Sequence, residues 1–260
     1  MNLSGLLPLV DEITAYQELL TQLAAGGMPG SPLSEARALG IFPAARAYLL
    51  AAIQRDAQQP LLVVTAQPER ARELVEQIRQ WSLLPEAVYH FPAPEALFYD
   101  RAAWPQQTVR ERVSILGMLA RPELHARFHD LRRSAIVVTS VSALLPKSVP
   151  PHLLAQHVRQ VRVGERLNLN DFLSALLESG YQPAAVVEEI GFFSRRGGIV
   201  DLFSPGQPAP VRIELFGDEV DSLRFFDPAT QRSLDTIATI TICPASEAMP
   251  AYGSRAAALV

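Results

Sequence analysis

The sequence has a single cysteine, Cys243, among its 260 residues. One cysteine excludes an internal disulfide and any zinc site built on several thiolates. Cys243 ends the apolar run TITIC, and cysteine is among the residue types most often buried. We therefore expect it to fill a strand position in the core.

Long apolar runs are also absent. No stretch reaches the roughly 18 apolar residues that a membrane-spanning helix needs. The first residues, MNLSGLLPLVDEI, have neither the basic start nor the long apolar centre of a signal peptide. These features predict a cytoplasmic protein without a membrane partner.

The sequence has fewer basic than acidic residues: 23 Lys and Arg and 27 Asp and Glu give a net charge of −4. A general basic field for nucleic acid is thereby excluded, although a local basic patch stays open.

The residues of an enzyme site are missing as well. A phosphate-binding loop needs glycines, a lysine and a Ser or Thr. The stretch LGIFPAARAYLL keeps only Gly40, and it has Arg46 and Ala47 where the lysine and the hydroxyl would stand. His125 and His129 are four residues apart, but no carboxylate has the spacing of a zinc protease. We predict no cofactor, no metal and no catalysis by this chain.

Two parts of the chain differ in pattern. Within 1–152, helical periodicity alternates with the short apolar runs 61–65 and 135–139, which are typical of buried parallel strands. This rhythm predicts an α/β domain. Residues 153–244 predict an inserted α+β domain, and 245–260 are expected to return to the first.

The inserted domain begins with a strand and a helix, DFLSALLESG, which Asn170 would cap and Gly180 would end. After that, apolar runs are joined by the tight turns SPGQPAP, FGDE and DPATQRS. Such spacing predicts an antiparallel β-meander.

One stretch of the meander, GFFSRRGGIVDLF, interrupts a core pattern with Arg195, Arg196, Gly197 and Gly198. A β-bulge at the two glycines would re-aim the strand and bring Arg196 to the outer face.

In the next strand, PVRIELF, alternation sends Val211 and Ile213 to the core and Arg212 and Phe216 outward. An exposed phenylalanine beside an arginine is typical of a binding patch. The alternative is a surface ion pair of Arg212 with Glu214 or Glu219, and a Phe216 tucked under its own turn.

The stretch from GFFSRRGGIVDLFSPG through PVRIELFGDEVDSLRFFDPATQRSL resembles a signature shared by the repair protein UvrB and the transcription-repair coupling factors (Mfd). FYDRAAWPQQTVRERVSIL, VVTSVSALLPK and VGERLNLNDFLSALLESGYQ resemble the coupling factors in the same order, so the likeness covers most of residues 35–245. UvrB has an intact phosphate loop and a long aromatic hairpin after the equivalent of Tyr99 and Asp100. This sequence has neither feature, which favours the coupling factors.

The resemblance implies an N-terminal, UvrB-like module: a degenerate P-loop NTPase-like domain with an inserted domain that binds UvrA. Motif alignment places the UvrA contacts on Arg196, Arg212 and Phe216. The family also has RNA-polymerase-binding and DNA-translocase domains, and a C-terminal domain that masks the UvrA surface. None of these is expected within 260 residues, so the resemblance implies an N-terminal fragment.

Two other hypotheses stay open. The first is direct nucleic-acid binding through Arg195, Arg196, Arg212 and Arg224, against which the net charge weighs. The second is a nucleotide-dependent enzyme, against which the degenerate loop around Gly40 weighs.

Overall fold

The computed structural model describes residues 2–26, 40–57, 59–94, 104–124, 134–247 and 249. The chain forms two compact units, Met1–Ala93 with Arg127–Leu145, and Pro94–Ala126 with Pro146–Val260. The expected boundaries at 152 and 244 describe where one domain is inserted into another, whereas these two units describe which residues pack together. The expected boundaries therefore stay a prediction. None of the described helices is both long and apolar enough to cross a membrane.

The first unit mixes helices with a parallel sheet. Its elements are the 3-10 helix η1 (Ser4–Glu12), α1 (Thr14–Gly26), η2 (Pro43–Ala45), α2 (Arg46–Asp56), β1 (Leu61–Thr65), α3 (Pro68–Trp81), η3 (Pro85–Ala87), β2 (Val88–Phe91), β3 (Ile136–Ser140) and α6 (Val141–Leu144).

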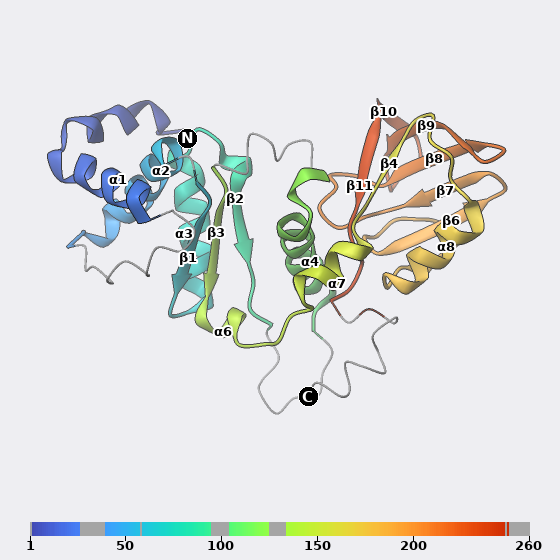
Figure 1. Cartoon of the computed structure of the whole chain (residues 1–260), viewed down its shortest axis with the longest axis horizontal. Helices are drawn as coiled ribbons and strands as arrows, with labels where there is room; N and C mark the ends of the chain where they lie inside the picture. Colours follow the sequence, from blue (N-terminus) through green and yellow to red (C-terminus); the bar gives the residue numbers. More distant parts are fainter. Residues whose placement is uncertain are drawn as a thin grey trace. The chain divides into compact units, whose positions relative to one another are not determined.

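The three strands of this unit pair in the order β1-β3-β2, and all are parallel (Figure 1). Helices α2 and α3 bury small and branched side chains, such as Ala52 and Ile78, against Ile136 and Val138 of the central strand. The parallel sheet with packed helices confirms an α/β arrangement.

One expectation for this sheet is wrong. The apolar run 61–65 predicts a strand buried on both faces, but Leu62 is 63% exposed and Val64 is 47% exposed. The physical reason is that only one face of β1 is covered: exposure alternates along the strand, and Leu62 and Val64 lie on the more exposed face.

The second unit combines short helices with antiparallel sheets. Its elements are α4 (Gln106–Ala120), η4 (Pro122–Leu124), α7 (Pro151–His157), β4 (Arg159–Arg162), α8 (Leu169–Glu178), β5 (Gln182–Pro183), β6 (Phe192–Arg196), β7 (Ile199–Leu202), β8 (Val211–Phe216), β9 (Glu219–Phe226), β10 (Ser233–Ile237) and β11 (Thr239–Ile242).

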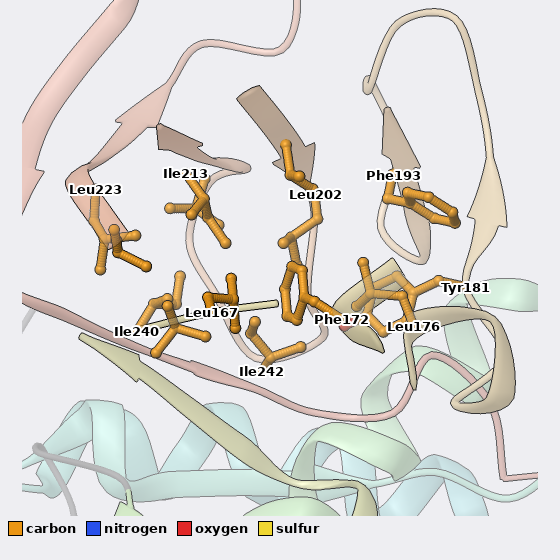
Figure 2. Close-up of a cluster of buried hydrophobic side chains, with 14 residues drawn as sticks. Leu167, Phe172, Leu176, Tyr181, Phe193, Leu202, Ile213, Leu223, Ile240 and Ile242 are labelled. Atoms are coloured by element: carbon orange, nitrogen blue, oxygen red, sulfur yellow. The ribbon is translucent and has the colours of Figure 1, made fainter. Parts of the chain in front are cut away.

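The predicted meander is confirmed from β6 to β10, which pair with their chain neighbours in a six-stranded sheet of order β10-β9-β8-β7-β6-β5. Strand β11 leaves the meander and pairs antiparallel with β4. Figure 2 shows the core between these layers, where Phe172 and Leu176 of α8 and Ile240 and Ile242 of β11 meet Ile213 and its neighbours on the inner face of the large sheet.

Helix α8 begins two residues earlier than its predicted cap requires. Asn168 is the capping residue, because its side-chain oxygen accepts bonds from the backbone N–H groups of Asn170 and Asp171. The predicted end is confirmed: Gly180 follows the helix with φ +87, a left-handed conformation that glycine adopts without strain.

Cys243 is buried as expected, although it follows β11 instead of lying within it. Helix α4 approaches it so closely that a Cβ added to Gly117 would come within 2.9 Å of the Cys243 sulfur. The same helix carries Arg112, whose fully buried Nε donates to Glu247 at 2.6 Å. Of the return segment 245–260, most residues lie outside the described ranges.

Candidate interaction surface

The two glycines of RRGG form a tight turn, not the predicted β-bulge. Arg196 of β6 pairs directly with Ile199 of β7, so Gly197 and Gly198 are the whole connection. Gly197 has φ +62, as a two-residue hairpin turn requires. A Cβ on Gly198 would meet the Leu215 carbonyl oxygen at 2.9 Å, and the Leu215 N–H donates to the Gly198 oxygen. The register shift falls instead in the β8–β9 pair, after Glu214.

Strand β8 has the predicted alternation of faces. Val211 and Ile213 are buried in the core, while Arg212 and Glu214 lie half-buried on the outer face, the face turned away from the core of Figure 2. Phe216, at the end of β8, is 84% exposed. It is therefore not tucked under its turn.

A buried carboxylate lies beneath the two outer-face arginines. Asp201 of β7 is directly opposite Arg212 of β8, and its side chain is only 2% exposed. Arg212 donates to it twice, from Nε at 2.7 Å and from Nη2 at 2.9 Å. Arg196 donates to the same carboxylate from Nη2 at 3.2 Å, while its own side chain stays 58% exposed.

Arg212 is held from a second side by an aromatic ring. Its guanidinium carbon lies 4.8 Å from the centroid of Phe226, which is fully buried. The hydrogen bonds to Asp201 raise the pKa of Arg212 above its ordinary value, against the opposing effect of burial. The guanidinium thus stays charged and has a defined orientation. We call Arg196, Arg212 and Phe216 the arginine–phenylalanine patch.

The other arginines of the nucleic-acid hypothesis are arranged differently. Arg224 donates to Glu214 at 2.6 Å, and Arg195 pairs with Val200 on the opposite face of the sheet. Because Arg196, Arg212 and Arg224 all have carboxylate partners, this face does not present a concentrated positive field. Such pairing is unfavourable for binding to a phosphate backbone.

The stretch LGIFPAARAYLL, interpreted from its sequence as a degenerate phosphate loop, leads into α2 in the first unit. Gly40 and Arg46 are exposed, and Ala47, at the hydroxyl position, is buried. Beside this stretch is a groove of about 740 Å³ with a mixed lining: aliphatic side chains such as Ile41 and Leu49 stand with the charged side chains of Arg46, Arg70 and Glu73.

Two histidines considered for a metal, His125 and His129, lie outside the described residues. Within the described ranges, no group of three His, Cys, Asp or Glu side chains is placed to hold a metal ion.

Sequence reasoning missed Asp201 and Phe226. An aspartate between apolar neighbours in IVDL reads as an outward, solvated residue. Only the pairing of β7 with β8 shows that it faces Arg212, and a register is not visible in the sequence.

Fold and surface together define a class of module. An antiparallel sheet carries two arginines on a buried carboxylate and, at the end of the same strand as Arg212, an exposed phenylalanine; arginine and aromatic side chains are enriched at protein interfaces.

The comparisons agree with this class. Residues 160–247 match the UvrB interaction domain family. The chain is 33% identical over 245 residues to the transcription-repair-coupling factor of Myxococcus xanthus, which covers 92% of this chain and 18% of that protein. It is 35% identical over 208 residues to that of Staphylococcus haemolyticus and 32% identical to that of Staphylococcus aureus strain Mu50, covering 80% of this chain and 17% of each relative.

The chain is thus homologous to the transcription-repair-coupling factors along most of its length, and its residues 160–247 match the UvrB interaction domain family. It spans less than a fifth of the length of these relatives.

Proposed function

We propose that this chain is a non-catalytic module that recruits UvrA to stalled RNA polymerase in transcription-coupled nucleotide-excision repair. UvrA docks on the arginine–phenylalanine patch. The observation that carries the proposal is the exposure of Phe216 at the end of the strand that carries Arg212, within the segment that matches the UvrB interaction domain. Arginine and aromatic side chains are the residue types that most often dominate binding energy.

A binding titration with purified UvrA tests the proposal. Arg212→Ala and Phe216→Ala should each weaken binding by about thirtyfold, or ~2 kcal/mol, because anchors of this kind typically lose at least that much. Two matched controls are available in the chain. Phe42 is also 84% exposed but lies in the first unit, and Arg195 is next to Arg196 but on the opposite face.

Phe42→Ala and Arg195→Ala should bind like the wild type. Wild-type binding that neither patch substitution weakens would refute the docking site, and the absence of saturable binding at high micromolar UvrA would refute recruitment by this chain.

The remaining activities of the coupling factors are assigned to the rest of the parent protein. In this proposal, polymerase binding and DNA translocation reside in other domains, and a C-terminal domain masks the patch at rest. The chain should therefore bind UvrA more tightly than the intact protein does. Equal affinity for the two would contradict masking.

For the first unit we propose a nucleotide-binding fold that has lost its phosphate loop. Support comes from the parallel sheet and from the buried Ala47, which stands where a phosphate loop would have its hydroxyl. Calorimetric titration with ATP and Mg²⁺ should give no saturable heat. Binding that Arg46→Ala abolishes would contradict this proposal.

A further inference from the structure

Asp201 is an unusual residue for the middle of a sheet. Its side chain is 2% exposed, and it lies between the buried Val200 and Leu202. Burying a carboxylate carries a large desolvation penalty, and well-packed apolar residues often stabilise a fold as well or better. The contribution of Asp201 to folding therefore gives no sufficient reason for its presence.

The geometry of its contacts indicates what Asp201 does instead. It accepts from Arg212 on the neighbouring strand β8 and from Arg196 on the other neighbouring strand, β6. One carboxylate therefore joins both arginines of the patch. The bonds from Arg212 use Nε and Nη2, so Nη1 and the second N–H of Nη2 are the donors that remain for a partner.

We propose that Asp201 is a positioning residue of the docking surface, which fixes Arg212 and Arg196 in the orientation in which they receive an acidic group of UvrA. This inference rests on the proposed function. Fixing a side chain in its bound conformation reduces the entropy lost on association. The planar guanidinium also needs the correct orientation for two parallel bonds to a carboxylate.

The opposite effect is physically reasonable too, which makes the sign of the result decisive. If Asp201 competes with UvrA for Arg212, its removal should free the guanidinium and strengthen binding. If Asp201 positions Arg212, its removal should weaken binding although the surface becomes more positive.

The experiment measures association and dissociation rates of UvrA with Asp201→Asn, which keeps the shape and removes the charge. Positioning predicts a dissociation rate at least about tenfold faster, with an association rate equal or higher, since loss of a buried charge partner acts mainly on dissociation. It also predicts that Asp201→Asn adds little when Arg212 is already alanine. Tighter binding, or two fully additive effects, would overturn the inference.

A second variant avoids dependence on the folding of Asp201→Asn. Arg212→Lys keeps the positive charge but cannot donate from two nitrogens in one plane. It should lose most of the affinity that Arg212→Ala loses. Wild-type affinity for Arg212→Lys would show that orientation of the guanidinium is irrelevant.

A third measurement needs no UvrA, so it separates this inference from the proposed function. In ¹⁵N spectra, the Nε–H of Arg212 should exchange slowly with water, and Asp201→Asn should accelerate that exchange while leaving Arg195 unchanged. An unaltered Arg212 signal would refute positioning. Failure of the wild type to bind UvrA would refute recruitment alone.

Discussion

Breaking the buried ion pair between Arg112 and Glu247 should destabilise the second unit strongly. The Arg112 side chain is 0% exposed and that of Glu247 is 10% exposed, and Nε lies 2.6 Å from Oε1. The guanidinium also lies over the Trp104 ring at 5.1 Å. Removing the charge of Glu247 takes from the buried guanidinium the carboxylate that lies 2.6 Å away, and such one-sided losses are destabilising.

The substitution Glu247→Gln keeps the shape and removes only the charge. One-sided disruption of a buried pair costs about 3–5 kcal/mol. We expect the lower end, about 3 kcal/mol, because Glu247 is slightly exposed and Arg112 keeps its contact with Trp104. With a urea m-value of about 2 kcal/mol/M for a unit of this size, the unfolding midpoint should fall by about 1.5 M.

The two tryptophans make the assay selective. Trp81 belongs to the first unit and Trp104 to the second, so a Trp81→Phe background leaves Trp104 as the fluorescent reporter. The control is Glu189→Gln, which removes a partner of Arg110 on the same helix α4. Glu189 is 62% exposed, and loss of such a surface pair should change stability by no more than about 0.5 kcal/mol. Equal midpoints for the two substitutions would refute the reasoning.

The remaining predictions concern the turn and two buried groups. Gly198→Ala should destabilise the second unit by about 1–3 kcal/mol in urea unfolding, because its Cβ would lie 2.9 Å from the Leu215 oxygen, whereas Gly40→Ala, in open space, should be near neutral. Burial raises the pKa of the Cys243 thiol to about 12, so a thiol reagent at pH 8 should react only after unfolding; rapid reaction of the folded protein would contradict this. Burial lowers the pKa of His157, although Glu178 opposes the shift. Because the unfolded chain then binds the proton more readily, the stabilising contribution is present above about pH 6.5 and is lost as pH falls through the folded-state pKa. His157→Gln should flatten this decline in the urea midpoint.

Local patterns in the sequence predict where helices, strands and turns occur better than they predict which side chains of those elements are buried. The meander and the positive-φ end of α8 at Gly180 follow from turn residues and alternation, which act locally. Whether both faces of a strand are covered depends on the tertiary arrangement, so the exposure of Leu62 could not be read from its apolar run. The strand β2 has only four residues, too few for a periodic signal.

The helix cap shows a different limit. The segment LNLND offers two asparagines, Asn168 and Asn170, with equal chemical ability to cap. The structure selects Asn168, which has the extended backbone that a capping residue needs. Spacing alone could not choose between them, because both precede an acceptable helix.

The candidate surface was predictable only in part, because the sequence shows alternation along a strand but not the register between strands. Alternation along β8 predicts that Arg212 lies on the outer face, and the structure agrees. It does not predict the partner, because the choice between Asp201, Glu214 and Glu219 depends on register. The two glycines were consistent with a bulge or a turn, and only the pairing of Arg196 with Ile199 distinguishes these.

The patch combines two anchors that differ in their energetics. Arg212 is ordered before binding, so it loses little freedom when UvrA docks, but part of its charge is already compensated by Asp201. Phe216 is 84% exposed, and its burial removes up to about 150–250 Å² from water. At about 25 cal/mol/Å² this gives an upper bound of about 4–6 kcal/mol before the cost of ordering the ring. In the proposed docking, Phe216→Ala should therefore cost at least as much binding as Arg212→Ala, and the arginines should mainly define the orientation of the partner.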